Sequence, residues 1–324
     1  MGKVIAIALN TFKEAVRNKV LYFLLIFAIL IMAFSAVISD LSISSPEKLI
    51  KDLGLASIDF FGFLIAVFVG VYLVYNELDR KTIYTIVSKP IDRTQFILGK
   101  FFGLLFTIYV NIAIMTFVFF AVLYFRESTA YEVMIKHLYS ETSPGHFVMV
   151  QSEWVYYLKT IFLSMGKSLG TMFGVYTTVL TAGLMKVVLM SALSLAIITS
   201  FAIFYSTFSS PTLSAVFTSL TFIIGSLCED IVRYADKLAE KAGGISHLAG
   251  AEAFKYWFAI VAVHIVPNLS YFDRRMNAVY GAPDIAAPQL FPPLLDWQTI
   301  VYGIGYTAAI VCLASLIFRN RNFK

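Results

Sequence analysis

Long apolar segments alternate with short charged segments along the 324 residues of this chain. A helix needs roughly 20 mostly apolar residues to cross about 30 Å of hydrocarbon. Six segments approach that length: Leu21–Ile38, Phe60–Tyr75, Phe102–Phe125, Val187–Tyr205, Leu213–Cys228 and Thr299–Phe318. A seventh, Tyr256–Val266, is too short to cross, and His264 and Pro267 favour a partly buried or re-entrant piece. The pattern predicts an all-α polytopic membrane protein, one domain over residues 1–324 with six transmembrane helices.

The first 20 residues carry a second pattern. Apolar residues recur at helical spacing, while the polar ones occupy the other side of the same helix; the apolar set is Ile5, Ala8, Leu9, Phe12, Ala15 and Val16. This arrangement predicts an amphipathic helix that lies in the membrane interface before the first span. A cleaved signal peptide is the alternative, with small residues at Ala33–Ala36, but the apolar run has the length of a span.

Composition and charge agree with a membrane protein and predict its orientation. Hydrophobic residues make up 59% of the chain and charged residues only 14%, which excludes a soluble domain of this size. Basic residues gather before the first span, between the second and third spans, and after the last one. With six spans these three groups share one face, so both termini are expected to be cytoplasmic in a cell membrane, inner or plasma. Residues 126–180 and 229–298 are then extracytoplasmic.

The segment from 76 to 100 separates the second and third spans and is more than a charged loop. Glu77–Val87 has a helical pattern, Ser88-Lys89-Pro90 breaks it, and Asp92 with Gln95 can cap a new helix. Gly99 and Gly103 form a GxxxG pair that permits close helix contact. The order predicts a helix, a proline turn and a second helix, although a solvated positive-inside loop is the plainer interpretation.

Residues 76–100, called the elbow below, have a sequence that resembles the type-2 ABC exporter permeases. Among these it resembles the branch linked to maturation of multicopper enzymes such as nitrous oxide reductase. An acidic residue after span two, a Lys-Pro-Ile-x-Arg turn and Phe-Ile-Leu-Gly-Lys carry the resemblance; its positions are Glu77, Arg80, Thr82, Ile83, Tyr84, Ser88, Lys89, Pro90, Ile91, Arg93, Phe96, Ile97, Leu98, Gly99 and Lys100. Weaker similarity extends to the N-terminal helix, the Ser209-Ser210-Pro211 turn and the basic tail after Phe318.

The resemblance implies a permease subunit whose elbow docks a separate ATPase. The residues implied in that contact are Glu77, Arg80, Ser88, Lys89, Pro90, Arg93, Gly99 and Lys100. ATP and Mg²⁺ would then sit on the partner chain, and this chain would bind no cofactor and would not itself be an enzyme. A homodimer or a pseudo-symmetric permease pair would match two ATPase subunits. The resemblance also implies that the chain is embedded in a lipid bilayer and does not bind nucleic acid.

Motifs for other chemistry are missing from the sequence. Gly166-Lys167-Ser168 is similar to the end of a Walker A motif, but its leading glycine position holds Ile161. Cys228 and Cys312 lie far apart, and Met134, His137, His146 and Met149 are scattered, so no metal site is expected. The predicted span cores hold no charged residue or histidine, which disfavours a proton-coupled carrier.

Several polar and small residues have two interpretations. Asn111, Thr218 and Thr221 could line a pathway or bond to neighbouring backbone, with the second favoured. Gly62, Ala66 and Gly70 form a stripe suited to packing within the chain or to a homodimer seam; Gly166, Gly170 and Gly174 form another.

The outer segments contain further helical patterns. A capped helix is predicted from Ser45-Pro46-Glu47 to Gly54, and another over Asp230–Ala242 that Gly243-Gly244 ends. These segments are expected to form a cap that meets an extracytoplasmic partner. Two other function classes stay open beside the exporter permease: a stand-alone secondary carrier and a non-transporting membrane scaffold.

Overall fold

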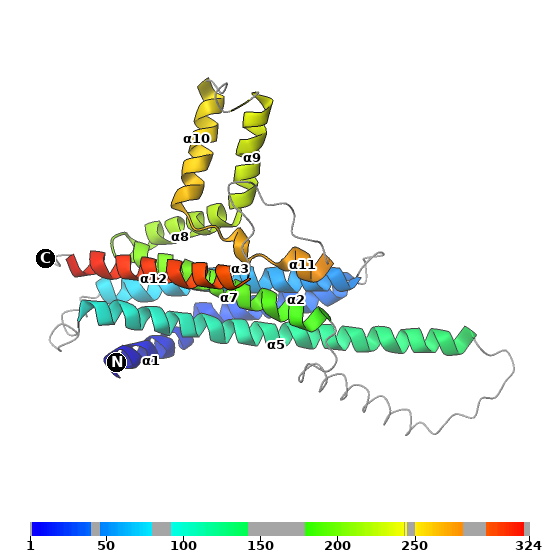
Figure 1. Ribbon diagram of the computed structural model, residues 1–324. Helices are drawn as coiled ribbons and strands as arrows, with labels where there is room; N and C mark the ends of the chain where they lie inside the picture. The colour runs from blue at the N-terminus through cyan, green and yellow to red at the C-terminus, as the bar shows by residue number, and fades with distance from the viewer. Residues whose placement is uncertain are drawn as a thin grey trace.

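A computed structural model describes residues 2–39, 46–79, 92–141, 179–242, 244, 250–280 and 296–320. Within these ranges the chain is helical and contains no strand (Figure 1). The elements in order are α1 (Gly2–Val16), α2 (Lys19–Ser39), α3 (Pro46–Asp79), α5 (Arg93–Glu141), α7 (Val179–Ser206), α8 (Pro211–Ser226), α9 (Cys228–Lys241), α10 (Gly250–Ile265), the 3₁₀ turn η2 (Ser270–Phe272), α11 (Arg275–Tyr280) and α12 (Asp296–Asn320). The predicted all-α fold is confirmed.

Five described helices are long and apolar enough to cross a membrane, in the stretches Lys19–Ser39, Lys48–Tyr72, Arg93–Leu123, Gly183–Ser206 and Asp296–Arg319. A sixth crossing exists only if α8 and α9 count as one span, because the chain bends by 60° between them. The α8 helix has 16 residues and rises about 24 Å, less than the hydrocarbon thickness. The chain is therefore a multi-pass membrane protein in which the predicted span Leu213–Cys228 is a shortened helix followed by a bend.

The prediction of a separate outer helix ending at Gly54 is wrong. The α3 helix runs unbroken for 34 residues through Gly54. A glycine inside a helix costs only about 1 kcal/mol, and here it makes room for a neighbour. A Cβ at Gly54 would lie 2.2 Å from a ring carbon of Phe119, so this position accommodates the aromatic side chain of α5.

The α5 helix is also longer than the sequence predicted. Its 49 residues rise about 73 Å, more than twice the thickness of the hydrocarbon layer. The expected span Phe102–Phe125 is its apolar part, and the helix continues to Glu141 in the segment predicted to be extracytoplasmic.

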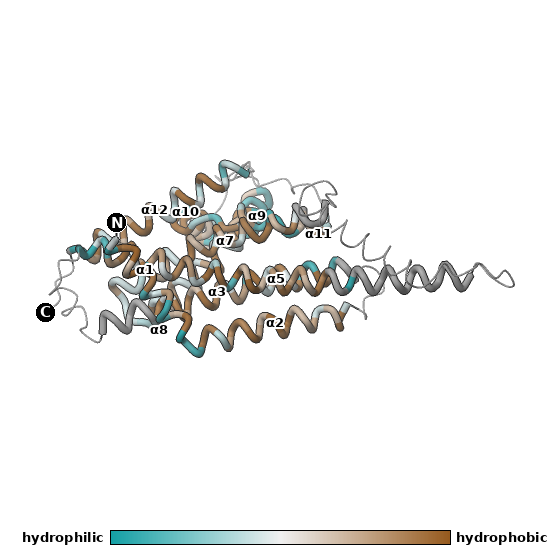
Figure 2. The backbone as a smooth tube through the Cα atoms, turned by 90° about the horizontal axis from the view of Figure 1, so that it is seen from below, coloured by the Kyte–Doolittle hydropathy of each residue, from teal (hydrophilic) through white to brown (hydrophobic). Residues whose placement is uncertain are grey.

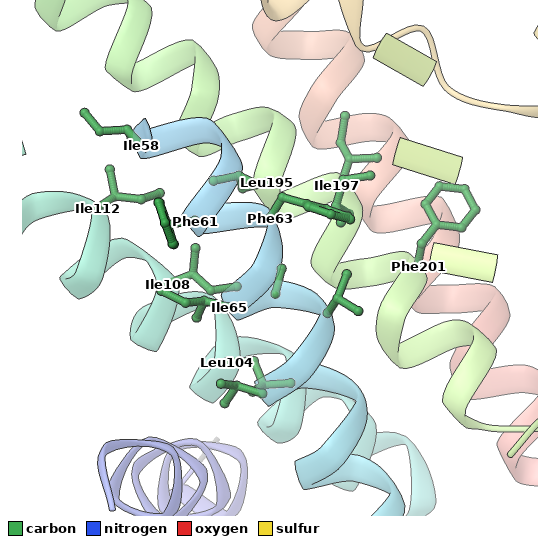
Figure 3. Packing of buried hydrophobic residues seen from close by; sticks show 14 of the residues in the cluster. Ile58, Phe61, Phe63, Ile65, Leu104, Ile108, Ile112, Leu195, Ile197 and Phe201 are labelled. Atoms are coloured by element: carbon green, nitrogen blue, oxygen red, sulfur yellow. The ribbon is translucent and has the colours of Figure 1, made fainter. Parts of the chain in front are cut away.

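The core of the bundle is built around α3, which packs between α5 and α7 (Figure 3). Buried aliphatic and aromatic side chains from the three helices meet there; those labelled in the figure are Ile58, Phe61, Phe63 and Ile65 of α3, Leu104, Ile108 and Ile112 of α5, and Leu195, Ile197 and Phe201 of α7. Most of the length of α2, α3 and α5 is hydrophobic (Figure 2), and large apolar side chains such as Phe23, Phe68 and Phe117 are exposed on the outside of the bundle. An apolar exterior is what a lipid environment requires.

The small-residue stripe of α3 is used inside this core. A Cβ at Gly62 would lie 2.4 Å from Leu195, and one at Gly70 would lie 3.6 Å from the Cβ of Ala202. Both neighbours belong to α7, and Ala66 between them is fully buried. Lipid supplies no hydrophobic drive between helices, so close backbone approach stabilises this pair. The stripe packs within the chain, and the homodimer-seam interpretation of it is wrong.

The two termini lie at the same end of the bundle, together with the C-terminal end of α3 and the start of α5 (Figures 1 and 2). The helices α9 and α10 form a hairpin that leaves the bundle after α8 and projects roughly at right angles to its long axis (Figure 1). The expected helix over Asp230–Ala242 is confirmed as α9, and the short apolar segment Tyr256–Val266 lies largely within α10.

Candidate functional site at the start of helix α5

The first turn of α5 is fixed by residues on either side of its start. The backbone N–H of Phe96 donates to the Asp92 carbonyl at 3.1 Å, which opens the helical hydrogen-bond ladder. The Gln95 amide donates from Nε2 to Oδ2 of Asp92, also at 3.1 Å. The expected pairing of these two residues is present in an altered form, because Gln95 reaches the side chain of Asp92 and not its backbone N–H.

Arg93 joins the start of α5 to the end of α12. Its Nη1 donates to the carbonyl oxygen of Arg319 at 3.0 Å and to that of Phe318 at 3.4 Å. The last carbonyls of a helix have no partner inside the helix and carry partial negative charge, so a guanidinium there is favourable. The ring of Phe96 stacks on that of Phe318, with centroids 5.8 Å apart and planes 18° apart.

The α1 helix lies against the same part of α5. A Cβ at Gly99 would lie 2.6 Å from the Cβ of Ile7, and one at Gly103 would lie 2.6 Å from the Ala8 carbonyl oxygen. No other residue type fits these two positions without moving α1. The prediction that the GxxxG pair permits close helix contact is confirmed, and α1 is the helix it receives.

Lys100 lies beneath this contact. Only 1% of its side chain is exposed, and its Nζ is 3.5 Å from Oε2 of Glu14 on α1. A buried ammonium group is tolerated when it is paired, so Glu14 helps to keep Lys100 inside. Lys100 was expected to shape a surface contact; because its charge is buried, it can act on such a surface only through α1.

The other residues predicted for this site lie mostly outside the described part of the chain. Glu77 belongs to the last turns of α3, and its side chain is not described. Arg80, Ser88, Lys89 and Pro90 fall between the described residues 79 and 92. The structure therefore brings Arg93, Gly99 and Lys100 together around the start of α5, and places the end of α3 at the same end of the bundle (Figure 1).

The three predicted pathway residues are buried and bonded to nearby backbone. Asn111 donates from Nδ2 to the Thr107 carbonyl at 2.8 Å, and its Oδ1 accepts no hydrogen bond from the described residues. Thr218 donates to the Ser214 carbonyl at 2.7 Å and Thr221 to the Phe217 carbonyl at 2.8 Å; the Thr221 hydroxyl also lies 3.0 Å from that of Tyr205. The favoured alternative, local backbone bonding, is what the geometry shows.

A groove between α3 and α8 was not anticipated from the sequence. Its volume is about 330 Å³, and it is lined almost entirely by apolar side chains: Phe63, Leu64, Val67, Phe68, Thr212, Ala215, Val216, Ser219, Leu220 and Ile223. Ser219 lines it, whereas the neighbouring Thr218 is fully buried on another face of α8. Composition alone does not reveal which side of a uniformly apolar helix is covered, so the sequence did not indicate this groove.

A cluster of charged residues around the N-terminal half of α3 was also not predicted from the sequence. Arg275 of α11 donates two parallel hydrogen bonds to Asp273, at 3.0 and 2.9 Å, and its Nε lies 3.7 Å from Oδ2 of Asp59. The Tyr280 hydroxyl donates to Asp52 at 2.6 Å. Asp59 lies within the span stretch Lys48–Tyr72, so the expectation of charge-free span cores is wrong for α3. The cause is the predicted boundary at Phe60, which left this carboxylate outside the span.

These ion pairs connect α11 and the start of α12 to the bundle. Burial by itself raises the pKa of Asp273, but hydrogen bonds from Arg275 and its positive charge outweigh burial and lower it below the usual value. Lys186 of α7 and Asp296 of α12 form a further pair at 2.5 Å. Together these contacts attach α11 to α3, and the start of α12 to α7. No group of three or more potential metal-ligating acidic, histidine or cysteine side chains occurs in the described ranges.

Comparison with known families assigns the chain. The family of ABC-2 family transporter proteins has a model that matches residues 5–323, nearly the whole sequence, so this chain belongs to that family. No curated protein matches it. Members of the family are membrane subunits of transporters and generally pair with ABC ATPase subunits.

Proposed function

We propose that this member of the ABC-2 transporter family is the permease subunit of an ATP-driven exporter, and that its elbow at residues 76–100 docks a separate ATPase. The end of the bundle that holds both termini, the end of α3 and the start of α5 would face the cytoplasm of a cell membrane. The three clusters of basic residues support this orientation. ATP and Mg²⁺ would bind to the partner, since the sequence of this chain has no phosphate-binding loop.

The observation that carries the proposal is the attachment of two helices, α1 and α12, to the start of α5. Arg93 and Phe96 bind the end of α12, while Gly99, Gly103 and Lys100 hold α1. A displacement of the elbow would therefore move α1, α5 and α12 together as a packed unit. Rigid-body motion of packed elements is how small movements at a binding site become changes in access across a membrane.

The Lys-Pro-Ile-x-Arg turn further suggests the branch linked to multicopper enzyme maturation. The outer segments 126–180 and 229–298 would then meet an extracytoplasmic partner. The charged face of α9 is the described surface that supports such a contact, with Asp230, Asp236 and Lys237 exposed.

Copurification tests the docking proposal. The tagged chain is purified from cells that express it naturally, and bound proteins are identified by mass spectrometry and by ATPase activity. We expect an ABC ATPase to copurify with the intact chain and to be lost on deletion of residues 88–93. Lys237→Glu, on the projecting α9–α10 hairpin, is the matched charge-changing control. Undiminished ATPase recovery after the deletion would contradict docking through the elbow.

We also propose that two copies pair across the groove between α3 and α8. Exposed apolar side chains border this groove on both helices, with Phe68 on α3 and Leu220 and Ile223 on α8. A two-fold related copy would cover both rows at once, and two permease chains would match two ATPase subunits. Val216→Cys in a Cys312→Ser background should crosslink in membranes, and Phe27→Cys on α2, which does not line the groove, should not. Equal crosslinking at both positions would argue against this seam.

A further inference from the structure

We propose that the corner between α1 and α2 binds the head groups of anionic phospholipids through Lys13, Arg17 and Lys19, in the membrane leaflet at the end of the termini. A helix that only lies in the interface would accept any phospholipid, whereas this corner would select the anionic ones. This inference goes beyond the proposed function, because it concerns the lipid around the chain and needs no ATPase.

The packing of α1 against α5 determines which sides of α1 remain exposed. A Cβ at Gly99 would lie 2.6 Å from the Cβ of Ile7, one at Gly103 would lie 2.6 Å from the Cβ of Thr11, and Ala15 is fully buried. Residues three and four apart share one face of a helix, so this contact runs along a single side of α1. The helix lies at the edge of the bundle (Figure 1), and its other sides are exposed.

The exposed part of α1 is divided into an apolar strip and a basic strip. Ile5 and Leu9, about one turn apart, are 58% and 51% exposed. Lys13 and Arg17, also about one turn apart and exposed, lie about 80° further round the same helix. A helix with basic side chains beside large exposed apolar ones is typical of the boundary between lipid and water. Acyl chains would cover the apolar strip while phosphate groups meet the basic strip.

The basic strip has no acidic side chain of its own. Glu14 is the only acidic residue among residues 1–39, and its carboxylate lies 3.5 Å from Nζ of Lys100 on the α5 side of the helix. Within the described part of the chain, no ion pair is formed by Lys13, Arg17 or Lys19. Like charges four residues apart on a helix repel each other, so an anionic ligand beside Lys13 and Arg17 is favourable.

The start of α2 places these charges at the level of lipid head groups. The span stretch Lys19–Ser39 begins with a basic residue, and large exposed apolar side chains, Val20 and Phe23 among them, follow it directly. The turn before it is well defined, because the Val20 N–H donates to Oδ1 of Asn18 at 3.0 Å. Arg17 and Lys19 therefore lie where the hydrocarbon layer ends.

A phospholipid fits this surface better than an acidic protein does. A water-soluble partner that met Lys13 and Arg17 would leave Ile5 and Leu9 beside it in water. An anionic phospholipid carries its negative charge and its apolar chains in one molecule, and can meet both strips at once. Guanidinium and phosphate form strong charge-assisted hydrogen bonds, and each basic side chain close to an anionic membrane surface strengthens binding about fivefold.

Photocrosslinking of the purified full chain in phosphatidylcholine vesicles tests the proposal. The vesicles contain a trace of phosphatidylglycerol or of phosphatidylcholine that carries a diazirine near its head group, and labelled peptides are mapped by mass spectrometry. We expect phosphatidylglycerol to label the peptides of α1 and the start of α2 at least about tenfold more than phosphatidylcholine does. Arg17→Gln should reduce this preference about fivefold, and the triple variant Lys13→Gln, Arg17→Gln, Lys19→Gln should abolish it.

Two control variants separate charge at this corner from net charge and from folding. The charge-matched control removes three lysines of the α9–α10 hairpin and should keep the preference: Lys237→Gln, Lys241→Gln and Lys255→Gln. A charge-preserving variant should also keep it: Lys13→Arg, Arg17→Lys and Lys19→Arg. If the neutral triple variant fails to fold, high salt on the natural chain gives a second measurement. Raising the ionic strength from about 0.1 M to about 1 M shortens the Debye length from about 10 Å to about 3 Å and should remove most of the preference.

Equal labelling of these peptides by the two lipids would overturn the proposal. A preference that persists in the neutral triple variant would overturn it as well, and so would displacement of phosphatidylglycerol by inorganic phosphate, which would indicate a site for free phosphate. Weak labelling by both lipids would mean that protein covers α1 and would also contradict it. The vesicles hold no ATPase, so failure of this proposal is distinguishable from failure of docking through the elbow.

Discussion

The ion pair between Lys100 and Glu14 helps to hold α1 against α5, and we predict that replacing Glu14 weakens this attachment more than replacing Lys100 does. Lys100 is 1% exposed and Glu14 is 39% exposed. Removing the carboxylate by Glu14→Gln leaves the ammonium buried with weaker compensation, whereas Lys100→Met removes the charge and keeps a side chain of similar length. Removing one partner of a buried ion pair typically costs about 3–5 kcal/mol, whereas an apolar replacement for such a pair is often neutral. Because Glu14 is partly solvated, we expect about 2 kcal/mol for Glu14→Gln and less than about 1 kcal/mol for Lys100→Met.

The local opening of α1 is the quantity to measure. Thr11 is fully buried between α1 and α5, so Thr11→Cys in a Cys312→Ser background places a thiol that reacts only when α1 detaches. A loss of about 2 kcal/mol should raise the labelling rate about 30-fold, and a loss under about 1 kcal/mol should raise it about fivefold at most. Glu229→Gln, which weakens a pair with Arg233 on α9, is the control and should leave the rate unchanged. An unchanged rate in Glu14→Gln together with a large increase in Lys100→Met would refute the reasoning.

Three further predictions concern the other contacts. Gly103→Ala should raise the same labelling rate by an amount equivalent to about 1–3 kcal/mol, because its Cβ would lie 2.6 Å from the Ala8 carbonyl oxygen; Gly305→Ala, whose Cβ meets nothing within 4 Å, should not, and equal effects would contradict the packing. Arg93→Gln should speed amide hydrogen exchange in the last turn of α12 by an amount equivalent to about 1–2 kcal/mol, since the charged donor to two carbonyls is lost; Lys19→Gln should not, and unchanged exchange in Arg93→Gln would count against the cap. The pair of Asp273 and Arg275 contributes its full stability at pH values above the ordinary aspartate pKa of 3.8, and it loses this contribution as the pH falls through the lowered pKa of Asp273. Below about pH 4, the thermal midpoint should therefore decrease with falling pH more steeply in the natural chain than in Asp273→Asn. Parallel curves for the two proteins would exclude the pair as the cause.

Local pattern predicted most of the fold, and tertiary packing explains where it failed. The lengths of the apolar segments in the sequence located the helices of the bundle, because a helix that crosses a membrane must be apolar over a fixed length. Gly54 was read as a stop, but the ring of Phe119 occupies the space that its missing side chain leaves. The bend after Ser226 was not visible, because Leu213–Cys228 is apolar throughout and only contacts with the turn after α10 reveal where the crossing ends.

The candidate site was predicted in part for the same reason. Gly99 and Gly103 indicated a close contact from their spacing, yet nothing in that spacing named α1 as the neighbour. Arg93 was identified by its place in a family motif, while its bonds to Phe318 and Arg319 join residues more than 200 positions apart. Such pairings follow from the three-dimensional arrangement and have no local signature.

The length of α5 gives the protein a long arm beyond the bilayer. The residues after Leu123, where its span stretch ends, continue as helix for about 27 Å to Glu141. A continuous helix is stiff over this distance, so a tilt of about 10° at the membrane boundary would sweep its tip through roughly 5 Å. Anything fastened near that tip would be displaced by events occurring a full membrane thickness away, without any second moving joint between them.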